Sequence, residues 1–179
     1  MIGVLVSGEG TNLQALIDDA LPIAAVASNK PRAQALERAR AAGIPTAVFE
    51  LERYDAREDR DAAMADWFVG RGVELVVCAG YMHLLRPTFL ARFPGRIVNT
   101  HSAPLPEFPG ARPIEDVLDA GAPETAATVH YVDAGVDTGP VIAAERVPVH
   151  DDDTVETLRA RVQAVEHKLL PKTVRSLIR

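Results

Sequence analysis

Hydrophobic and polar positions alternate along this chain with two different periods. Short apolar, β-branched runs bounded by glycine or proline have the pattern of buried strands, and between them apolar residues recur every three or four positions, as in helices. The runs that predict strands are residues 2–7, 22–27, 45–49, 73–79, 96–101, 125–132 and 140–149. The segments that predict helices are the one that follows Asn12, residues 31–42, residues 55–70, the one that begins at Pro87, residues 113–118, and residue 154 to the C-terminus.

The order of these elements predicts the fold class. Strands that are apolar throughout and alternate with helices are typical of a parallel sheet covered on both faces. The last two strands are joined by the loop 133–139, which predicts a hairpin-like pair. We therefore expect an α/β fold, namely a Rossmann-like, doubly wound, mostly parallel sheet with a C-terminal hairpin-like strand pair and a long terminal helix, formed as a single domain by residues 1–179.

Two polar side chains close the run at residues 96–101. Because side chains alternate along a strand, Asn99 and His101 lie on one face and Thr100 lies on the other. An amide donor beside an imidazole, where a strand gives way to a proline-rich loop, can stabilise an oxyanion and move a proton. The alternative is that Asn99 caps a turn and His101 is a surface histidine.

Composition narrows the class of protein. The net charge is −6 and no cluster of basic residues stands out, which argues against nucleic acid as the ligand. The single cysteine, Cys78, lies in an apolar run, which predicts a buried, inert thiol and fits a reducing cytosol. No basic leader follows Met1 and no apolar run reaches membrane length. We therefore expect a cytoplasmic protein that acts on small molecules, with no nucleic-acid or membrane partner, and either a monomer or a homodimer.

The glycine-rich loop at residues 8–12 lies between a predicted strand and a predicted helix. Backbone amides and the helix dipole at such a position attract phosphate. The loop is not a dinucleotide fingerprint, because Leu13 replaces the third glycine and the second strand ends in Ser28-Asn29, not in an acid for a ribose diol. A single phosphate is therefore the better prediction than bound NAD, and a plain tight turn is the alternative.

The roles of three charged residues depend on which side chain or ligand lies next to them in the folded protein. Asp137 lies in a turn-forming loop, where an acid is ordinarily solvated. If a histidine lies next to it, Asp137 would hold that histidine in the imidazolium form. Glu166 projects from the edge of the apolar stripe of the last helix, so it needs a partner, either an arginine or the amine or hydroxyls of a ligand. Arg57 is expected on the buried face of its helix, and a surface pair with Asp61 is the alternative.

Ten segments carry a resemblance over nearly the whole chain: residues 4–15, 28–30, 36–39, 42–45, 79–82, 84–85, 99–101, 109–110, 137–141 and 166–167. In order, they resemble the family of phosphoribosylglycinamide (glycinamide ribonucleotide) formyltransferases. The set Asn99, His101 and Asp137 is similar to that of all folate-dependent formyltransferases, whereas the loop at residues 8–12 and the short length select this family. One loop departs from the pattern of this family. Residues 102–106 read Ser-Ala-Pro-Leu-Pro in place of the usual Pro-Ser-Leu-Leu-Pro. Residues 111–114 are more similar to the corresponding loop of methionyl-tRNA formyltransferases.

The resemblance implies a reaction and a site. The reaction is transfer of a formyl group from 10-formyltetrahydrofolate, as co-substrate and without a metal, to the amine of 5'-phosphoribosylglycinamide. Asn99, His101 and Asp137 are implied as catalytic. The residues implied to bind the acceptor substrate are Gly10, Thr11, Asn12, Gln163, Ala164, Val165 and Glu166. Those implied to bind folate are Arg57, Met82, His83, Leu84, Leu85, Asn99, Asp133, Ala134, Gly135, Val136 and Asp137.

Other functions remain as alternatives. A formyltransferase with another amine acceptor, or a formyltetrahydrofolate hydrolase, would use the same donor. A protein of a different class, a non-catalytic phosphometabolite-binding domain, could have the same fold, because a fold does not determine a function. Such a binding domain has no need of Asn99, His101 and Asp137 together.

Overall fold

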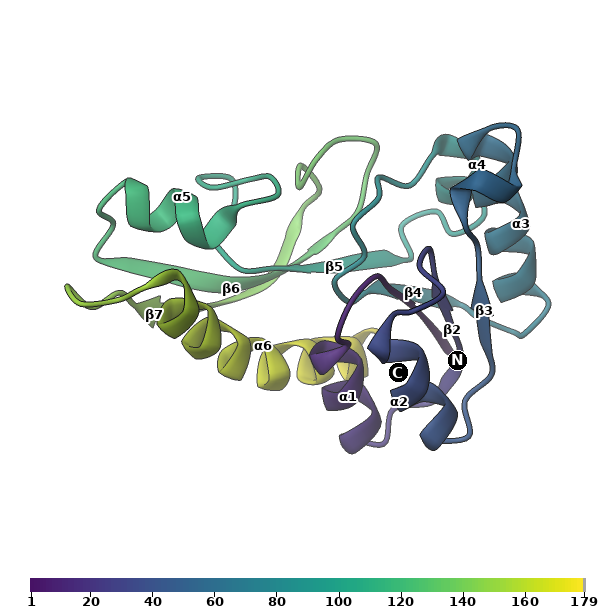
Figure 1. The fold of residues 1–179 in the computed structure, drawn as a ribbon, viewed down its shortest axis with the longest axis horizontal. Helices are drawn as coiled ribbons and strands as arrows, with labels where there is room; N and C mark the ends of the chain where they lie inside the picture. Colours follow the sequence, from purple (N-terminus) through teal and green to yellow (C-terminus); the bar gives the residue numbers. More distant parts are fainter. Residues whose placement is uncertain (179) are drawn as a thin grey trace.

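The computed structural model describes residues 1–178 and places seven strands in one sheet, in the order β3-β2-β1-β4-β5-β6-β7 (Figure 1). The first five strands are parallel, whereas β6 runs antiparallel to β5, and β7 runs antiparallel to β6. The strands are β1 Ile2–Val6, β2 Ile23–Ser28, β3 Thr46–Val48, β4 Leu75–Cys78, β5 Ile97–His101, β6 Glu124–Tyr131 and β7 Val141–Pro148.

Helices cover both faces of this sheet. Buried side chains of α1, α2, α5 and α6 form one core cluster with alternate residues of β1, while α3 and α4 pack in a second cluster with Leu5 on the opposite face. The long helix α6 runs from beneath β6 and β7 to α1 (Figure 1). The helices are α1 Thr11–Asp18, α2 Gln34–Ala41, α3 Arg57–Val69, α4 Pro87–Leu90, α5 Pro113–Asp119 and α6 Val155–Leu177, with a short 3-10 helix, η1, at Leu51–Arg53.

The predicted architecture is confirmed: a doubly wound, mostly parallel sheet that ends in the hairpin-like pair β6–β7 and a long terminal helix. One helix begins later than predicted, at Gln34 instead of Pro31. Its start is set by a tertiary contact, because the Ala35 N–H donates to the carbonyl of Gly8 at 3.1 Å. None of the helices in the described part of the chain is long and apolar enough to cross a membrane.

The expectation for Arg57 was wrong. Arg57 is the first residue of α3 and its side chain is exposed, whereas Arg60 and Asp61, one turn later, are fully buried. The expected partner of Arg57 is already engaged, because Asp61 Oδ1 lies 2.7 Å from Arg60 Nη2. Without a partner, a guanidinium at a helix N-terminus is more stable in water.

Candidate active site

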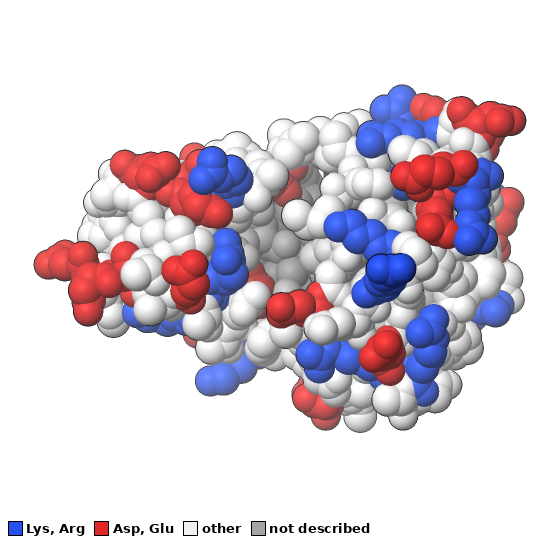
Figure 2. Space-filling view, viewed as in Figure 1, with Lys and Arg blue, Asp and Glu red and all other residues white. Residues whose placement is uncertain are grey.

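A cleft of about 750 Å³ opens at the carboxyl ends of β1, β4 and β5, where open α/β sheets bind ligands. Figure 2 shows it as a hollow near the middle of the face in view. The loop after β6, the loop after β5 and the middle of α6 complete its walls. Most of the residues predicted for the site lie here.

Most of the predicted site residues line the cleft, but four do not. Gly10, Thr11, Asn12, Met82, His83, Leu84, Leu85, Asn99, His101, Asp133, Gly135, Val136, Asp137, Gln163 and Glu166 all line it. Arg57, Ala134, Ala164 and Val165 are not among its lining residues. Burial and the charge of Arg60 lower the pKa of His83, and the charge of Arg57 adds to this effect, so Arg57 lies near the cleft.

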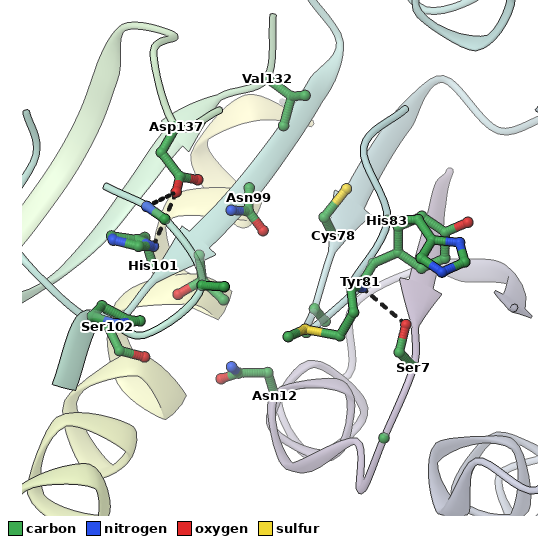
Figure 3. A pocket seen from close by; sticks show the side chains of 18 of the residues that line it. Ser7, Asn12, Cys78, Tyr81, His83, Asn99, His101, Ser102, Val132 and Asp137 are labelled. Atoms are coloured by element: carbon green, nitrogen blue, oxygen red, sulfur yellow. Dashed lines mark hydrogen bonds and ion pairs between the residues drawn. The ribbon is translucent and has the colours of Figure 1, made fainter. Parts of the chain in front are cut away.

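His101 and Asp137 face each other from β5 and the loop after β6 (Figure 3). His101 Nδ1 lies 3.5 Å from Asp137 Oδ2. His101 Nε2 lies 2.6 Å from the carbonyl oxygen of Phe108, so it carries a proton and donates it there. In the neutral ring, Nδ1 would then turn a lone pair towards the carboxylate, whereas in the imidazolium it donates an N–H. His101 Nδ1 can therefore donate to Asp137 only when the ring carries both protons.

A second imidazole, which the sequence did not point to, faces the other oxygen of Asp137. His130 is only 2% exposed, and its Nε2 lies 3.5 Å from Asp137 Oδ1. Its Nδ1 lies 2.9 Å from the Tyr131 carbonyl, and Asn99 Nδ2 lies 3.2 Å from its Nε2. His130 stands directly opposite Asn99 because β5 and β6 pair in antiparallel register. That register was the only available signal, and the sequence alone does not supply it.

Asp137 is held in a strained backbone conformation. Its φ of 53° lies in the left-handed region, which non-glycine residues adopt at a cost of roughly 1–2 kcal/mol. Burial opposes ionisation, but hydrogen bonds from His130 and from the Gly110 N–H, together with the charge of His101, hold the pKa of Asp137 below its usual value. The Gly110 bond, 2.9 Å to Oδ2, ties the loop after β5 to the same carboxylate. Asp137 is therefore an anion that positions two histidines and a loop.

Glu166 has its partners within the protein, and neither is an arginine. The carboxylate is 3% exposed and accepts hydrogen bonds from Asn12 Nδ2 at 3.0 Å and from Ser102 Oγ at 2.5 Å. Ser102 lies in the atypical part of the loop after β5, so sequence reasoning had not assigned it to the site. Together these three residues join α1, the β5 loop and α6 at the floor of the cleft.

The glycine-rich loop ends at the N-terminus of α1. Gly10 is the N-cap with a φ of 77°, and no side chain caps the first turn, so its backbone N–H groups remain available to an anion. Asn12 Oδ1 is buried without a hydrogen-bond partner among residues 1–178. Lys30 and Arg159 line the same cleft and supply positive charge that sequence reasoning had not assigned to the site.

The opposite end of the cleft is apolar. Met82 is 64% exposed, although it is large and hydrophobic, and Leu84 and Val136 are also exposed. Cys78 also lines the cleft and is buried, as predicted, and this burial raises the pKa of its thiol to about 12. Residues 1–178 hold no cluster of three or more His, Cys, Asp and Glu side chains that could bind a metal ion.

Comparisons with known proteins point in one direction. A sequence model described as formyl transferase matches residues 1–174. Phosphoribosylglycinamide formyltransferase of Haemophilus influenzae is 38% identical over 97% of this chain and 85% of its own length. The trifunctional purine biosynthetic protein adenosine-3 of Chironomus tentans is 40% identical over 97% of this chain, which spans only 13% of that longer protein. The crystal structure of phosphoribosylglycinamide formyltransferase from Streptococcus pneumoniae TIGR4 superposes with a TM-score of 0.96 at 42% identity, covering 99% of this chain and 98% of that one.

Proposed function

This chain belongs to the formyl transferase family, and from that premise we propose that it transfers a formyl group from 10-formyltetrahydrofolate to the amine of 5'-phosphoribosylglycinamide, a step of purine biosynthesis. It is a folate-dependent enzyme with small-molecule substrates. The observation that carries this proposal is the carboxylate of Asp137 lying 3.5 Å from two imidazoles, beside the amide of Asn99. A domain that only binds a metabolite has no use for that arrangement.

The acceptor substrate fits the polar end of the cleft. Its phosphate binds at the start of α1, where the backbone N–H groups of Gly10, Thr11 and Asn12 are free of a capping side chain. Glu166, oriented by Asn12 and Ser102, accepts hydrogen bonds from ribose hydroxyls or from the glycinamide end. Ala164 and Val165 lie on α6 beside Glu166, so we assign them a supporting place next to the acceptor site.

The folate fits the apolar end of the cleft. The segment 82–85 and the loop 133–137 face each other across it and expose Met82, Leu84 and Val136. A flat heteroaromatic ring that covers these side chains removes apolar surface from water, at about 25 cal/mol per Å². Arg57 lies outside this wall, where its charge is available to a carboxylate of the folate tail.

The reaction then needs one oxyanion site and one route for a proton. The substrate amine attacks the formyl carbon, the new C–N bond forms, and the bond from that carbon to N10 of the folate breaks. The side-chain amide of Asn99 and protonated His101 donate hydrogen bonds to the developing oxyanion. Asp137 holds His101 in its cationic form and, through water, helps move the amine proton to N10. No metal ion takes part in this scheme.

The cleft draws on residues from Ser7 to Glu166, so we also propose that the whole chain acts as one domain. The test of the function is an absorbance assay for tetrahydrofolate formation with and without phosphoribosylglycinamide. The proposal predicts product only when that amine is present. Product formed with water alone would indicate a hydrolase, product formed only with a different amine would indicate another acceptor, and no product with any acceptor would indicate a binding domain.

A further inference from the structure

Four polar side chains that the reaction scheme does not use form a connected line beneath the folate wall. Arg60 of α3 is fully buried, and its Nη1 lies 2.7 Å from Nδ1 of His83. Nε2 of His83 lies 3.3 Å from the side-chain amide of Asn29, and that amide lies 2.6 Å from Ser7 Oγ. The hydroxyl of Ser7 in turn accepts the Met82 N–H at 2.9 Å. A buried guanidinium is thus connected to the backbone of the folate wall.

The direction of these hydrogen bonds follows from the chemistry of the groups. A guanidinium only donates, so His83 Nδ1 accepts, and the neutral ring carries its proton on Nε2. In the structure Asn29 Nδ2 faces His83 and Ser7 Oγ donates to Asn29 Oδ1, so donation from Nε2–H requires the Asn29 amide to be turned over, with its oxygen facing His83 and its nitrogen facing Ser7. This orientation exchanges two atoms of the same shape and moves nothing else. Each group then donates to the next one, from Arg60 to the hydroxyl of Ser7.

The surroundings of His83 maintain this arrangement. Burial and then the charges of Arg60 and Arg57 lower the pKa of His83, so the ring is neutral at physiological pH. Because the pKa of His83 is lowered, only acidification would change its protonation state. A protonated ring could no longer accept the hydrogen bond from Arg60. The charged groups that act on the ring are Arg60, Arg57, Asp61 and Lys30, of which only Asp61 favours the imidazolium, and Tyr81 packs edge-on against it at 5.9 Å.

Asp61 ties the far end of the same wall to α3. Its Oδ1 accepts a hydrogen bond from Arg60 Nε at 2.8 Å, and its Oδ2 accepts one from the backbone N–H of Arg86 at 2.7 Å. The segment 82–86 is therefore held at its start by Ser7 and at its end by Asp61. Arg60 is connected to both anchors, directly to Asp61 and through His83 and Asn29 to Ser7.

We propose that Arg60 is a positioning residue of the folate site: by donating to His83 it keeps that ring in the Nε2–H form, and this form holds the wall segment 82–85 in the conformation that binds folate. The proposal rests on the proposed function for the identity of the ligand. The state of His83 itself does not depend on it, so the two can be tested separately.

The first experiment observes His83 directly, by NMR of protein labelled with ¹⁵N-histidine. His83→Asn assigns the signal, because it removes that resonance alone. We expect the wild-type ring to remain in the Nε2–H form from about pH 6 to about pH 8, with no titration near the ordinary value of about 6.5. A proton on Nδ1, or a titration within that range, would overturn the proposal whether or not the protein transfers formyl groups.

The second experiment removes the donor. Arg60→Met alone would leave Asp61 as an unpaired buried charge, so the variant combines Arg60→Met with Asp61→Asn. We expect its His83 to titrate near the ordinary value, and its KM for 10-formyltetrahydrofolate to rise roughly tenfold below that pH while kcat and the KM for phosphoribosylglycinamide change little. A KM for folate that stays at the wild-type value, or an equal loss in all three constants, would contradict a positioning role.

Two further variants control for folding. Arg92→Met removes an exposed arginine that pairs with Asp66 outside the cleft, and it should leave all three constants unchanged. His83→Leu removes the acceptor that Arg60 requires, whereas His83→Asn retains an acceptor oxygen at nearly the same place. The proposal predicts that His83→Leu raises the KM for folate more than His83→Asn does, even if the double variant fails to fold. Equal effects of the two His83 variants would overturn it.

Discussion

Gly10→Ala should destabilise the protein by about 3 kcal/mol, whereas Gly8→Ala in the same loop should change stability by less than about 1 kcal/mol. Gly10 has a φ of 77°, and an alanine in that region costs roughly 1 kcal/mol. A Cβ at Gly10 would also lie 2.5 Å from Cβ and 2.7 Å from Cα of Ala35, so α2 must move, at a cost of roughly 1–3 kcal/mol. A Cβ at Gly8 would have nothing within 4 Å.

Equilibrium urea unfolding of the two variants tests this difference. Adding Ala35→Gly to Gly10→Ala removes the Cβ contact but leaves the contact with the Ala35 backbone, so it should restore only part of the loss. Because a shifted α2 also displaces the start of α1, Gly10→Ala should weaken the binding of phosphoribosylglycinamide more than that of folate. If Gly10→Ala unfolds at the wild-type urea concentration, or if Gly8→Ala is destabilised equally, close packing on Ala35 is not the reason for this glycine.

Further expectations concern the catalytic pair, acid stability and the core. Asp137→Asn should lower turnover roughly 10²–10⁴-fold at neutral and higher pH, with partial recovery on acidification that His101→Ala does not show; a uniformly scaled pH–rate profile would contradict this. Hydrogen bonds from Arg161 and from a backbone N–H hold the pKa of Asp153 well below its usual value, so its stabilising effect is present above about pH 4 and is lost as the pH falls towards the folded-state pKa. Melting temperatures should therefore separate Asp153→Asn from wild type at about pH 6, and this separation should shrink steadily as the pH falls below about 4. Phe89→Ala should cost roughly 3–5 kcal/mol in urea unfolding, because this ring is fully buried among other aromatic rings; a loss below about 1 kcal/mol would be evidence against that packing.

The sequence by itself determined the order and kind of the elements. A strand buried on both faces has to be apolar throughout, and Leu75–Cys78 and Ile2–Val6 show this without help from distant residues. The alternation of such runs with helical segments leaves few topologies, because parallel strands need crossover connections. The place of Asn99 and His101 at a strand end also followed from local pattern, and that end turned out to be the cleft.

The tertiary structure decided which side chains meet. His130 became part of the site only through its antiparallel register with Asn99, which depends on how β6 docks against β5. Ser102 became a partner of Glu166 because its loop folds over α6, although 64 residues separate the two in sequence. Local sequence carries no information about contacts of that range, since they depend on how whole elements pack.

The same reason explains why Arg60 is buried on α3, whereas the sequence predicted that Arg57 would be. Helical spacing allows either arginine to lie near the buried face of α3, and an isolated helix would expose both. Burial of Arg60 is stable only because Asp61 and His83 accept its hydrogen bonds, and His83 reaches it from a loop 23 residues away. Periodicity determines which residues share a helix face. Which charged residue can leave water depends on the partners that the folded chain brings to it.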